Sequence, residues 1–132
     1  MKIRIIILLI LFAYNYCYSR LVISELMPAP NVDEPEWIEL YNSSNQTELI
    51  DSLRISDLTK TVILKNIEIK SGGYFVITSD SLELKKSRVI PDSSKIFQMT
   101  IPTLNNTTDA LIIRYGDNYY DSLYYDMTWG TK

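Results

Sequence analysis

The chain has 132 residues, 16 acidic and 13 basic, with a formal net charge of −3, no histidine and one cysteine. This length fits a single domain. The lack of histidine excludes Ser-His-Asp and Cys-His nucleophilic sites and every zinc site that uses histidine. The acidic balance, without a basic stripe interleaved with aromatic residues, argues against nucleic-acid binding by this domain alone.

The first nineteen residues have the pattern of a secretory signal peptide. Lys2 and Arg4 precede an unbroken apolar run at residues 5–13. This run is too short to cross a bilayer as a helix, which needs about 20 residues. The alternatives, an uncleaved anchor or a buried strand, fit the pattern less well.

The expected cleavage point lies before Arg20, because Cys17 and Ser19 are small residues at the −3 and −1 positions. Residues 1–19 would then be removed, and residues 20–132 would form the mature domain. We expect this domain to be periplasmic, on the cell surface or extracellular, with no membrane attachment after cleavage. Cleavage would also remove the one cysteine, and an exported domain without disulfides is more typical of bacteria than of eukaryotes.

Short extended segments follow along the chain, with turn-forming residues between them. Apolar and polar residues alternate in most of these segments, as in strands with one buried face. The predicted strands are residues 21–27, 36–42, 49–57, 61–64, 65–70, 74–78, 95–100, 109–115 and 119–125. Residues 79–91 lack a clean period and are interpreted as a surface loop with at most a helical turn. Strands at this spacing predict an all-β sandwich.

The segment at residues 36–42, EWIELYN, is the one around which we expect the sandwich to be built. Ile38 and Leu40 would face the core, whereas the alternate residues, Trp37 among them, would face away from it. A second local signal is the pair Gly72-Gly73, which permits the positive φ of a tight turn.

Six motifs occur in order along the chain: LVISELM at 21–27, EWIELYN at 36–42, DSLRISD at 51–57, IEIKSGGYFVIT at 67–78, LNNTTD at 104–109, and DSLYY at 121–125 followed by Trp129-Gly130. Each is similar to a motif of the lamin tail domain family. The residues at the family's signature positions are Glu25, Glu36, Trp37, Glu39, Leu40, Asn42, Asp57, Gly72, Gly73, Asn105, Asp109 and Trp129. The resemblance implies an immunoglobulin-like β-sandwich in which these residues have structural roles. It also implies a final strand after Trp129-Gly130, so we expect the chain to be a C-terminally truncated piece of a longer protein.

Carboxylates are the remaining groups that could carry chemistry. Glu25, Glu36 and Glu39 lie on or beside the first two strands, so two of them could come close if these strands pair. They could form a general acid/base pair or, with the acidic loop at residues 33–36, a Ca²⁺ site. We prefer a solvated polar face with hydrogen bonds that fix the proline-rich loop. We therefore predict no catalytic residue, no metal and no cofactor.

Aromatic residues could bind sugars, because Trp37, Trp129 or a tyrosine-rich hairpin could stack on them. The hairpin tyrosines are Tyr115, Tyr119, Tyr120, Tyr124 and Tyr125. We expect Tyr120 and Tyr124 to share one face and Tyr119 and Tyr125 the other. Packing in the core and at an edge is the preferred interpretation.

The favoured function is a non-catalytic interaction or structural domain of an exported bacterial protein. Its partner would be another protein or a cell-surface polymer. Three alternatives remain: an accessory domain of a larger secreted phosphoesterase or nuclease, a carbohydrate-binding module, and a small enzyme that uses the glutamates.

Overall fold

We describe a computed structural model of the protein, in which the described residues are 20–116, 118–126 and 128. The predicted signal peptide and Trp129 lie outside the described residues, as does the side chain of Tyr119. Among the described residues, no helix is long and apolar enough to cross a membrane.

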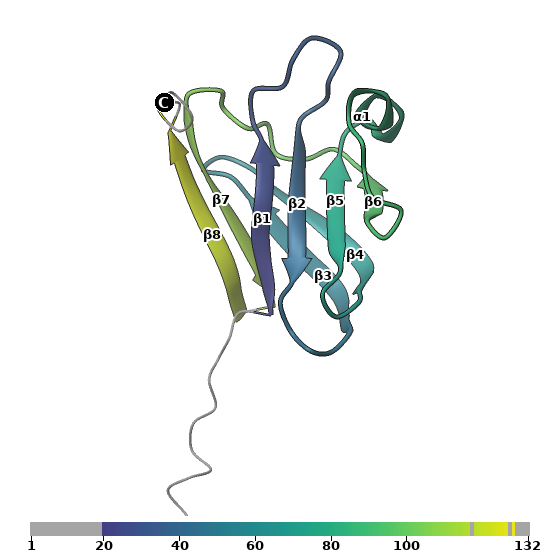
Figure 1. Ribbon diagram of the computed structural model, residues 1–132. Helices are drawn as coiled ribbons and strands as arrows, with labels where there is room; N and C mark the ends of the chain where they lie inside the picture. The colour runs from purple at the N-terminus through teal and green to yellow at the C-terminus, as the bar shows by residue number, and fades with distance from the viewer. Residues whose placement is uncertain (1–19, 117, 127, 129–132) are drawn as a thin grey trace, which may run out of the picture.

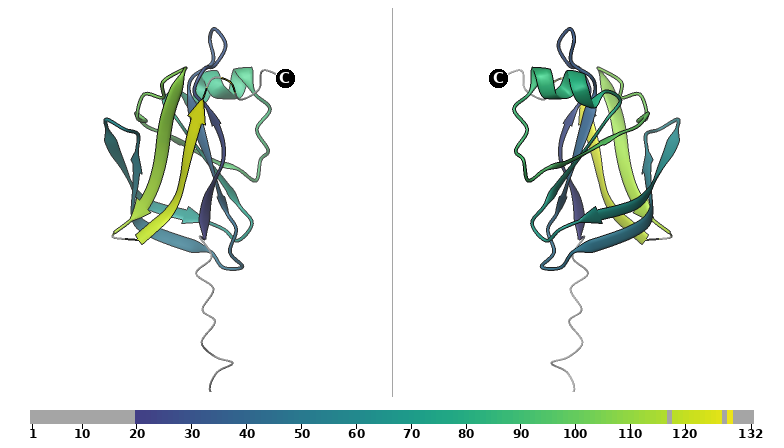
Figure 2. Two further views of the ribbon diagram at one scale, coloured as in Figure 1. Left: turned by 90° about the vertical axis from the view of Figure 1, so that its left-hand side faces the viewer. Right: turned by 90° about the vertical axis from the view of Figure 1, so that its right-hand side faces the viewer.

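Two four-stranded sheets stack face to face (Figures 1 and 2). Sheet A has the order β1-β2-β5-β6, and sheet B has the order β4-β3-β7-β8. The strands are β1 (Leu21–Met27), β2 (Trp37–Asn42), β3 (Glu48–Ser56), β4 (Thr61–Ile69), β5 (Tyr74–Thr78), β6 (Lys95–Gln98), β7 (Thr108–Tyr115) and β8 (Asn118–Asp126). Paired strands are antiparallel except β5 and β6, which are parallel. The prediction of an all-β sandwich is confirmed.

The core lies between the two sheets and is filled by alternate residues of the strands. Ile38 and Leu40 of β2 are fully buried there, as the alternation predicted. They meet residues of sheet B such as Leu53 and Ile113, which are also fully buried. Burial of each such side chain stabilises the fold by about 1.5–3 kcal/mol.

Residues 61–64 and 65–70, predicted as two strands, form the single strand β4. The alternation breaks at Asn66, whose φ of 55° lies in the left-handed region. Buried positions change parity there, from Leu64 to Ile67. Asparagine tolerates this conformation better than most residues, so the break marks an irregularity inside a strand rather than a turn.

Residues 79–91, predicted as a loop, contain the helix α1 (Ser81–Ser87). Asp80 caps it, because its carboxylate accepts hydrogen bonds from the N–H groups of Leu82 at 2.9 Å and Glu83 at 3.1 Å. The helix has seven residues, too few for a 3.6-residue period to be visible in the sequence. It lies against the outer face of sheet A (Figure 1), where Leu84 is buried.

A register shift between Ile113 and Arg114 changes which β8 residues face the core. Tyr125 is buried in the core and Tyr120 packs against it, whereas Tyr124 is 60% exposed. The prediction that Tyr120 and Tyr124 share one face is therefore wrong. A bulge adds one residue to one strand and so inverts the alternation beyond it.

Candidate functional site

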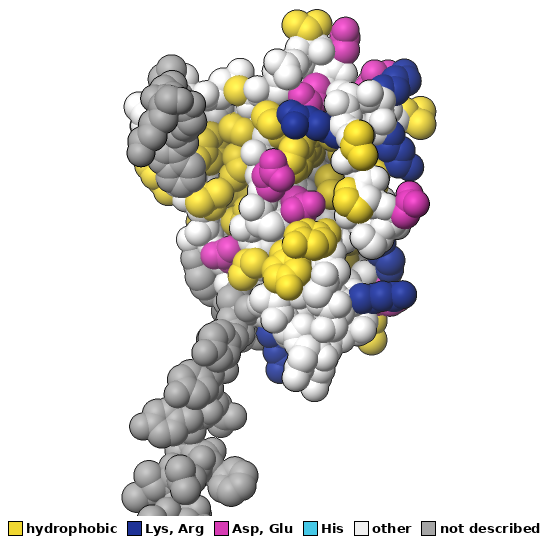
Figure 3. Space-filling model, in the orientation of Figure 1, with side chains coloured by type: hydrophobic (Ala, Val, Ile, Leu, Met, Phe, Trp, Pro, Cys, Tyr) yellow, Lys and Arg dark blue, Asp and Glu magenta, His cyan; other side chains and the backbone are white. Residues whose placement is uncertain are grey.

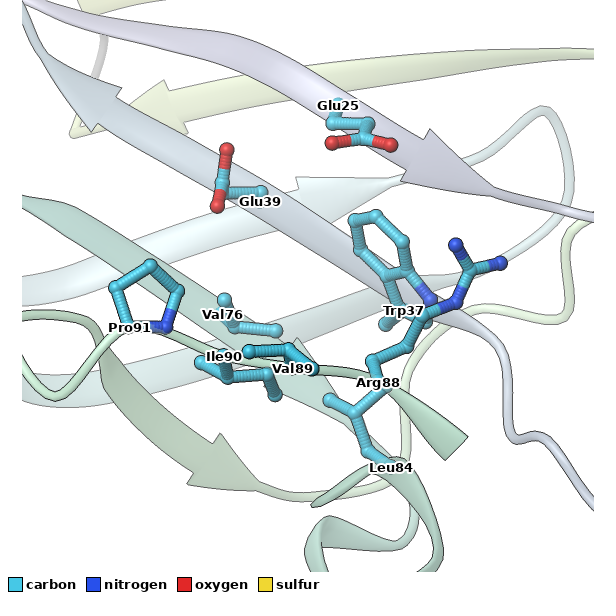
Figure 4. Close-up of a pocket in the computed structure, with 9 residues that line it drawn as sticks. All are labelled: Glu25, Trp37, Glu39, Val76, Leu84, Arg88, Val89, Ile90 and Pro91. Atoms are coloured by element: carbon cyan, nitrogen blue, oxygen red, sulfur yellow. The ribbon is translucent and has the colours of Figure 1, made fainter. Parts of the chain in front are cut away.

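A hollow of about 230 Å³ lies on the outer face of sheet A, between β1, β2, β5 and the segment that follows α1. Acidic side chains lie next to apolar ones on this face of the molecule (Figure 3). In Figure 4, Glu25 and Glu39 border one side of the hollow, and Val89–Pro91 border the other. We call this site the Trp37 hollow; its lining residues are Glu25, Trp37, Glu39, Val76, Leu84, Arg88, Val89, Ile90 and Pro91.

Trp37 is only 6% exposed, although it lies on the outer face of its sheet. Leu84 of α1 and Val76 of β5 pack against it. The guanidinium of Arg88 lies 5.9 Å from the centre of the indole ring, within cation–π range. Trp37 therefore forms a wall of the hollow and does not present a free ring face for stacking.

Glu34 and Arg88 form an ion pair beside this wall. The Nε of Arg88 donates to Glu34 Oε1 at 2.5 Å, and the Nη2 of Arg88 donates to Glu34 Oε2 at 3.3 Å. The indole Nε1 of Trp37 donates to the same carboxylate at 3.3 Å. The hydrogen bond from Arg88, opposed by burial and helped by the bond from Trp37, lowers the pKa of Glu34. The pair joins the loop before β2 to the segment after α1.

This ion pair holds part of the acidic loop at residues 33–36. The side chain of Glu34 is 3% exposed, and its carboxylate is bound by Arg88. Its backbone also contacts Asn31, because Glu34 N–H donates to the Asn31 carbonyl at 3.1 Å. The loop is thus fixed by hydrogen bonds, as the preferred interpretation of the sequence proposed.

Glu25 and Glu39 are directly opposite each other on β1 and β2. Glu39 accepts a hydrogen bond from the hydroxyl of Ser24 at 2.8 Å. Neither glutamate forms an ion pair with another described residue. The sequence placed these two residues in the same neighbourhood, and strand pairing brings them together.

Glu36, the third glutamate, lies apart from this pair. It accepts a hydrogen bond from the backbone N–H of Leu104 at 3.3 Å, and burial raises its pKa. Within the described part of the chain, no group of three or more acidic, histidine or cysteine side chains could hold a metal ion. The glutamates and the acidic loop do not meet in one cluster.

Asn42 is fully buried at the end of β2. Its Nδ2 donates to the carbonyls of Gln46 at 2.8 Å, Ile69 at 3.0 Å and Lys70 at 3.1 Å. Its Oδ1 accepts from the N–H of Ser44 at 3.0 Å. The side chain therefore joins two backbone segments, the turn after β2 at Ser44 and Gln46 and the end of β4 at Ile69 and Lys70.

The glycine turn beside Asn42 depends on backbone conformation and on close approach. Gly72 has a φ of 64°, and its N–H donates to the Asn42 carbonyl at 3.0 Å. A Cβ added at Gly73 would lie 2.9 Å from the Lys70 carbonyl oxygen. The expected tight turn at Gly72-Gly73 is confirmed.

Two buried aspartates close turns. Asp57 accepts hydrogen bonds from the N–H groups of Thr59 and Lys60, which is an Asx-turn. Asp109 is 1% exposed and accepts hydrogen bonds from the backbone N–H of Asn105 at 3.1 Å and from the Nδ2 of Asn105 at 2.9 Å.

The signature residue Leu40 is fully buried in the core between the sheets.

The tyrosines do not form one platform. Tyr115 and Tyr120 stack with ring centres 6.4 Å apart and pack against the core. A different pair, Tyr41 and Tyr74, stands opposite in register on β2 and β5 with ring centres 4.8 Å apart. The sequence does not predict this second pair, because nothing local shows that β2 and β5 are neighbours.

The sequence also does not predict the remaining wall of the Trp37 hollow. Its pattern places Arg88 and Ile90 in a surface loop. The one signal that could have placed them is Asp80, three residues before Glu83, because this spacing is typical of a helix start. A helix there returns the following segment to the sheet.

The family model described as Lamin Tail Domain matches residues 16–126 of the chain. No curated protein matches the chain. The match covers well over half of the chain and agrees with the two antiparallel-rich sheets of the structure. The chain belongs to the lamin tail domain family, whose members are immunoglobulin-like, non-catalytic domains.

Proposed function

We propose that this chain is a non-catalytic interaction module of an exported protein, and that it binds a partner protein through the Trp37 hollow. The observation that carries the proposal is the Glu25–Glu39 pair. Two like charges directly opposite each other on neighbouring strands destabilise a sheet. A cation from outside the chain would remove this repulsion.

The lining of the hollow defines the chemistry of the partner. Val89 and Ile90 offer apolar surface, and the two carboxylates lie across from them. A lysine or arginine side chain has an aliphatic stem and a charged end, so it can satisfy both surfaces at once. Charge complementarity of this kind governs specificity and association rate.

NMR titration tests the proposal. Acetyl-Val-Arg-Val-amide should shift the Trp37 indole resonance and the amides of Glu25, Glu39 and Ile90, and the same peptide with glutamine for arginine should not. The double variant Glu25→Gln/Glu39→Gln should lose the response. The matched control is Asp51→Asn, which removes an exposed carboxylate of β3 outside the hollow. Shifts that are absent, or that persist in the double variant, would refute the proposal.

Export is the second part of the proposal, and its support is the signal-peptide pattern of residues 1–19. Expression in a bacterial host followed by N-terminal sequencing of the exported protein should give Arg20 as the first residue. Retention of the intact N-terminus in the cytoplasm would contradict it.

A carbohydrate-binding module is the second candidate function, and the Tyr41–Tyr74 pair favours it. Tyr74 is 41% exposed, so its ring is open to a ligand. Tyr74→Ala should abolish glycan binding if this function holds, whereas it should leave the arginine peptide response unchanged. An accessory role beside a hydrolase domain would be decided by the gene sequence on either side of this chain.

A further inference from the structure

Two arginines lie directly opposite each other on the outer face of sheet B. Arg54 of β3 pairs in register with Arg114 of β7, and both side chains are exposed. Their neighbours Leu53 and Ile113 are buried in the core, so the arginines point away from it. Because β3 and β7 are the inner strands of the sheet, the repulsion between these charges cannot be relieved by an edge strand moving away.

No carboxylate among the described residues forms an ion pair with either arginine. The cations that do have carboxylate partners are Arg20, Lys86, Arg88 and Lys95. The chain has more acidic than basic residues, so acidic partners are not scarce in the sequence. The charges of this cationic pair are thus not compensated by a described carboxylate and are available to bind an anion.

A hollow of about 360 Å³ lies over this pair, and none of the described acidic residues lines it; the lining residues are Arg54, Ser56, Thr61, Ile112, Arg114 and Gly116. The hydroxyls of Ser56 and Thr61 lie 2.8 Å apart and share a hydrogen bond. Arg54 donates from Nη1 to the carbonyl oxygen of Gly116 at 3.2 Å, which orients its guanidinium. The hollow thus combines two guanidinium groups with two hydroxyls.

We propose that the Arg54–Arg114 hollow binds a tetrahedral oxyanion, a phosphate or sulfate group. A carboxylate has two oxygens, which one arginine can occupy in a bidentate arrangement. A tetrahedral oxyanion has enough oxygens to accept from two arginines on different strands and from a hydroxyl as well. The site lies on the opposite sheet from the Trp37 hollow and does not rest on the proposed function.

Thermal unfolding in phosphate at constant ionic strength, balanced with NaCl, tests the site. The melting temperature should rise by about 2 °C when phosphate equals its dissociation constant and by about 6 °C at ten times that concentration. Arg114→Gln should weaken the apparent affinity by about tenfold or more. Lys65→Gln, which removes an exposed cation of β4 outside the hollow, should behave as the wild type.

Further measurements separate specific binding from general salt effects. They also show whether the anion is a free ion or part of an ester. Methyl phosphate, an ester such as a polymer would carry, should bind as inorganic phosphate does, and acetate should not. NMR should show saturable shifts of the Arg54 and Arg114 Nε–H resonances. Equal stabilisation of the wild type, Arg114→Gln and Lys65→Gln, or arginine resonances that do not respond, would overturn the proposal. Binding of free phosphate without methyl phosphate would restrict the site to the free ion and support the oxyanion assignment.

Discussion

Asn42 and the Glu25–Glu39 pair lie on β1 and β2, yet the partners of their polar side chains differ. Asn42 is fully buried and donates to three carbonyls. Glu39, three residues earlier on β2, faces another glutamate and forms no ion pair with any described residue. All three residues are signature positions, so the difference separates a signature residue that holds backbone segments together from signature residues whose charges we propose serve binding.

The largest loss of stability is expected from a substitution of Asn42. Asn42→Ala should lower the free energy of unfolding by about 3 kcal/mol, because several buried carbonyls lose their donor at once. Urea denaturation measures it. Asn45→Ala, three residues later and exposed, should change stability by less than about 0.5 kcal/mol. Equal effects at both positions would show that Asn42 does not hold the turn.

Arg88 is expected to have the next largest effect. Arg88→Met should cost about 2 kcal/mol, because it leaves the buried Glu34 carboxylate without its cation. This value is below that for a fully buried pair, since Arg88 is 39% exposed. Adding Glu34→Gln to Arg88→Met should recover part of the loss, and a further loss of stability would contradict the ion-pair account.

The same pair predicts a pH dependence with a defined sign. The pKa of Glu34 is lowered in the folded state from its ordinary value of 4.5. Its contribution to stability is therefore complete above pH 4.5 and is lost as the pH falls through the lowered pKa. Urea denaturation as a function of pH should show the gap between the wild type and Glu34→Gln/Arg88→Met narrowing below pH 4.5. A difference in stability between the wild type and the double variant that widens in acid would contradict the predicted sign.

Gly72→Ala should lower the free energy of unfolding by a smaller amount, about 1 kcal/mol. Gly72→Ala places a Cβ on a residue with a φ of 64°, although no neighbouring atom lies within 4 Å of that Cβ. The cost is then conformational rather than steric. Gly72→Asn should be better tolerated than Gly72→Ala in thermal unfolding, because asparagine adopts positive φ more readily. Equal melting temperatures for the two variants would argue against this cause.

The parts of the fold that sequence could predict are those that depend on local alternation. Ile38 and Leu40 were placed in the core because they alternate with polar residues on one strand. The face of Tyr120 is not predicted correctly because β8 has an extra residue at Tyr120, between Tyr119 and Asp121, and nothing in the local pattern indicates this bulge. The helix α1 was missed because its seven residues carry little periodicity.

The candidate site was predictable to a smaller degree. Glu25 and Glu39 were named as possible neighbours because consecutive strands often pair. The contact of Glu34 with Arg88 joins residues 54 positions apart in the chain, and only the path of the chain through α1 brings them together. Arg54 and Arg114 are 60 positions apart in number and meet only because β3 pairs with β7.

The most direct test of the account is a paired measurement on Glu25→Gln/Glu39→Gln. Removing two opposed charges that form no ion pair with a described residue should raise the free energy of unfolding by about 0.5 kcal/mol in urea. The same variant should bind acetyl-Val-Arg-Val-amide at least about fivefold more weakly. Higher stability together with weaker binding is the predicted result. A loss of stability, or unchanged peptide affinity, would contradict the claim that these charges serve binding rather than folding.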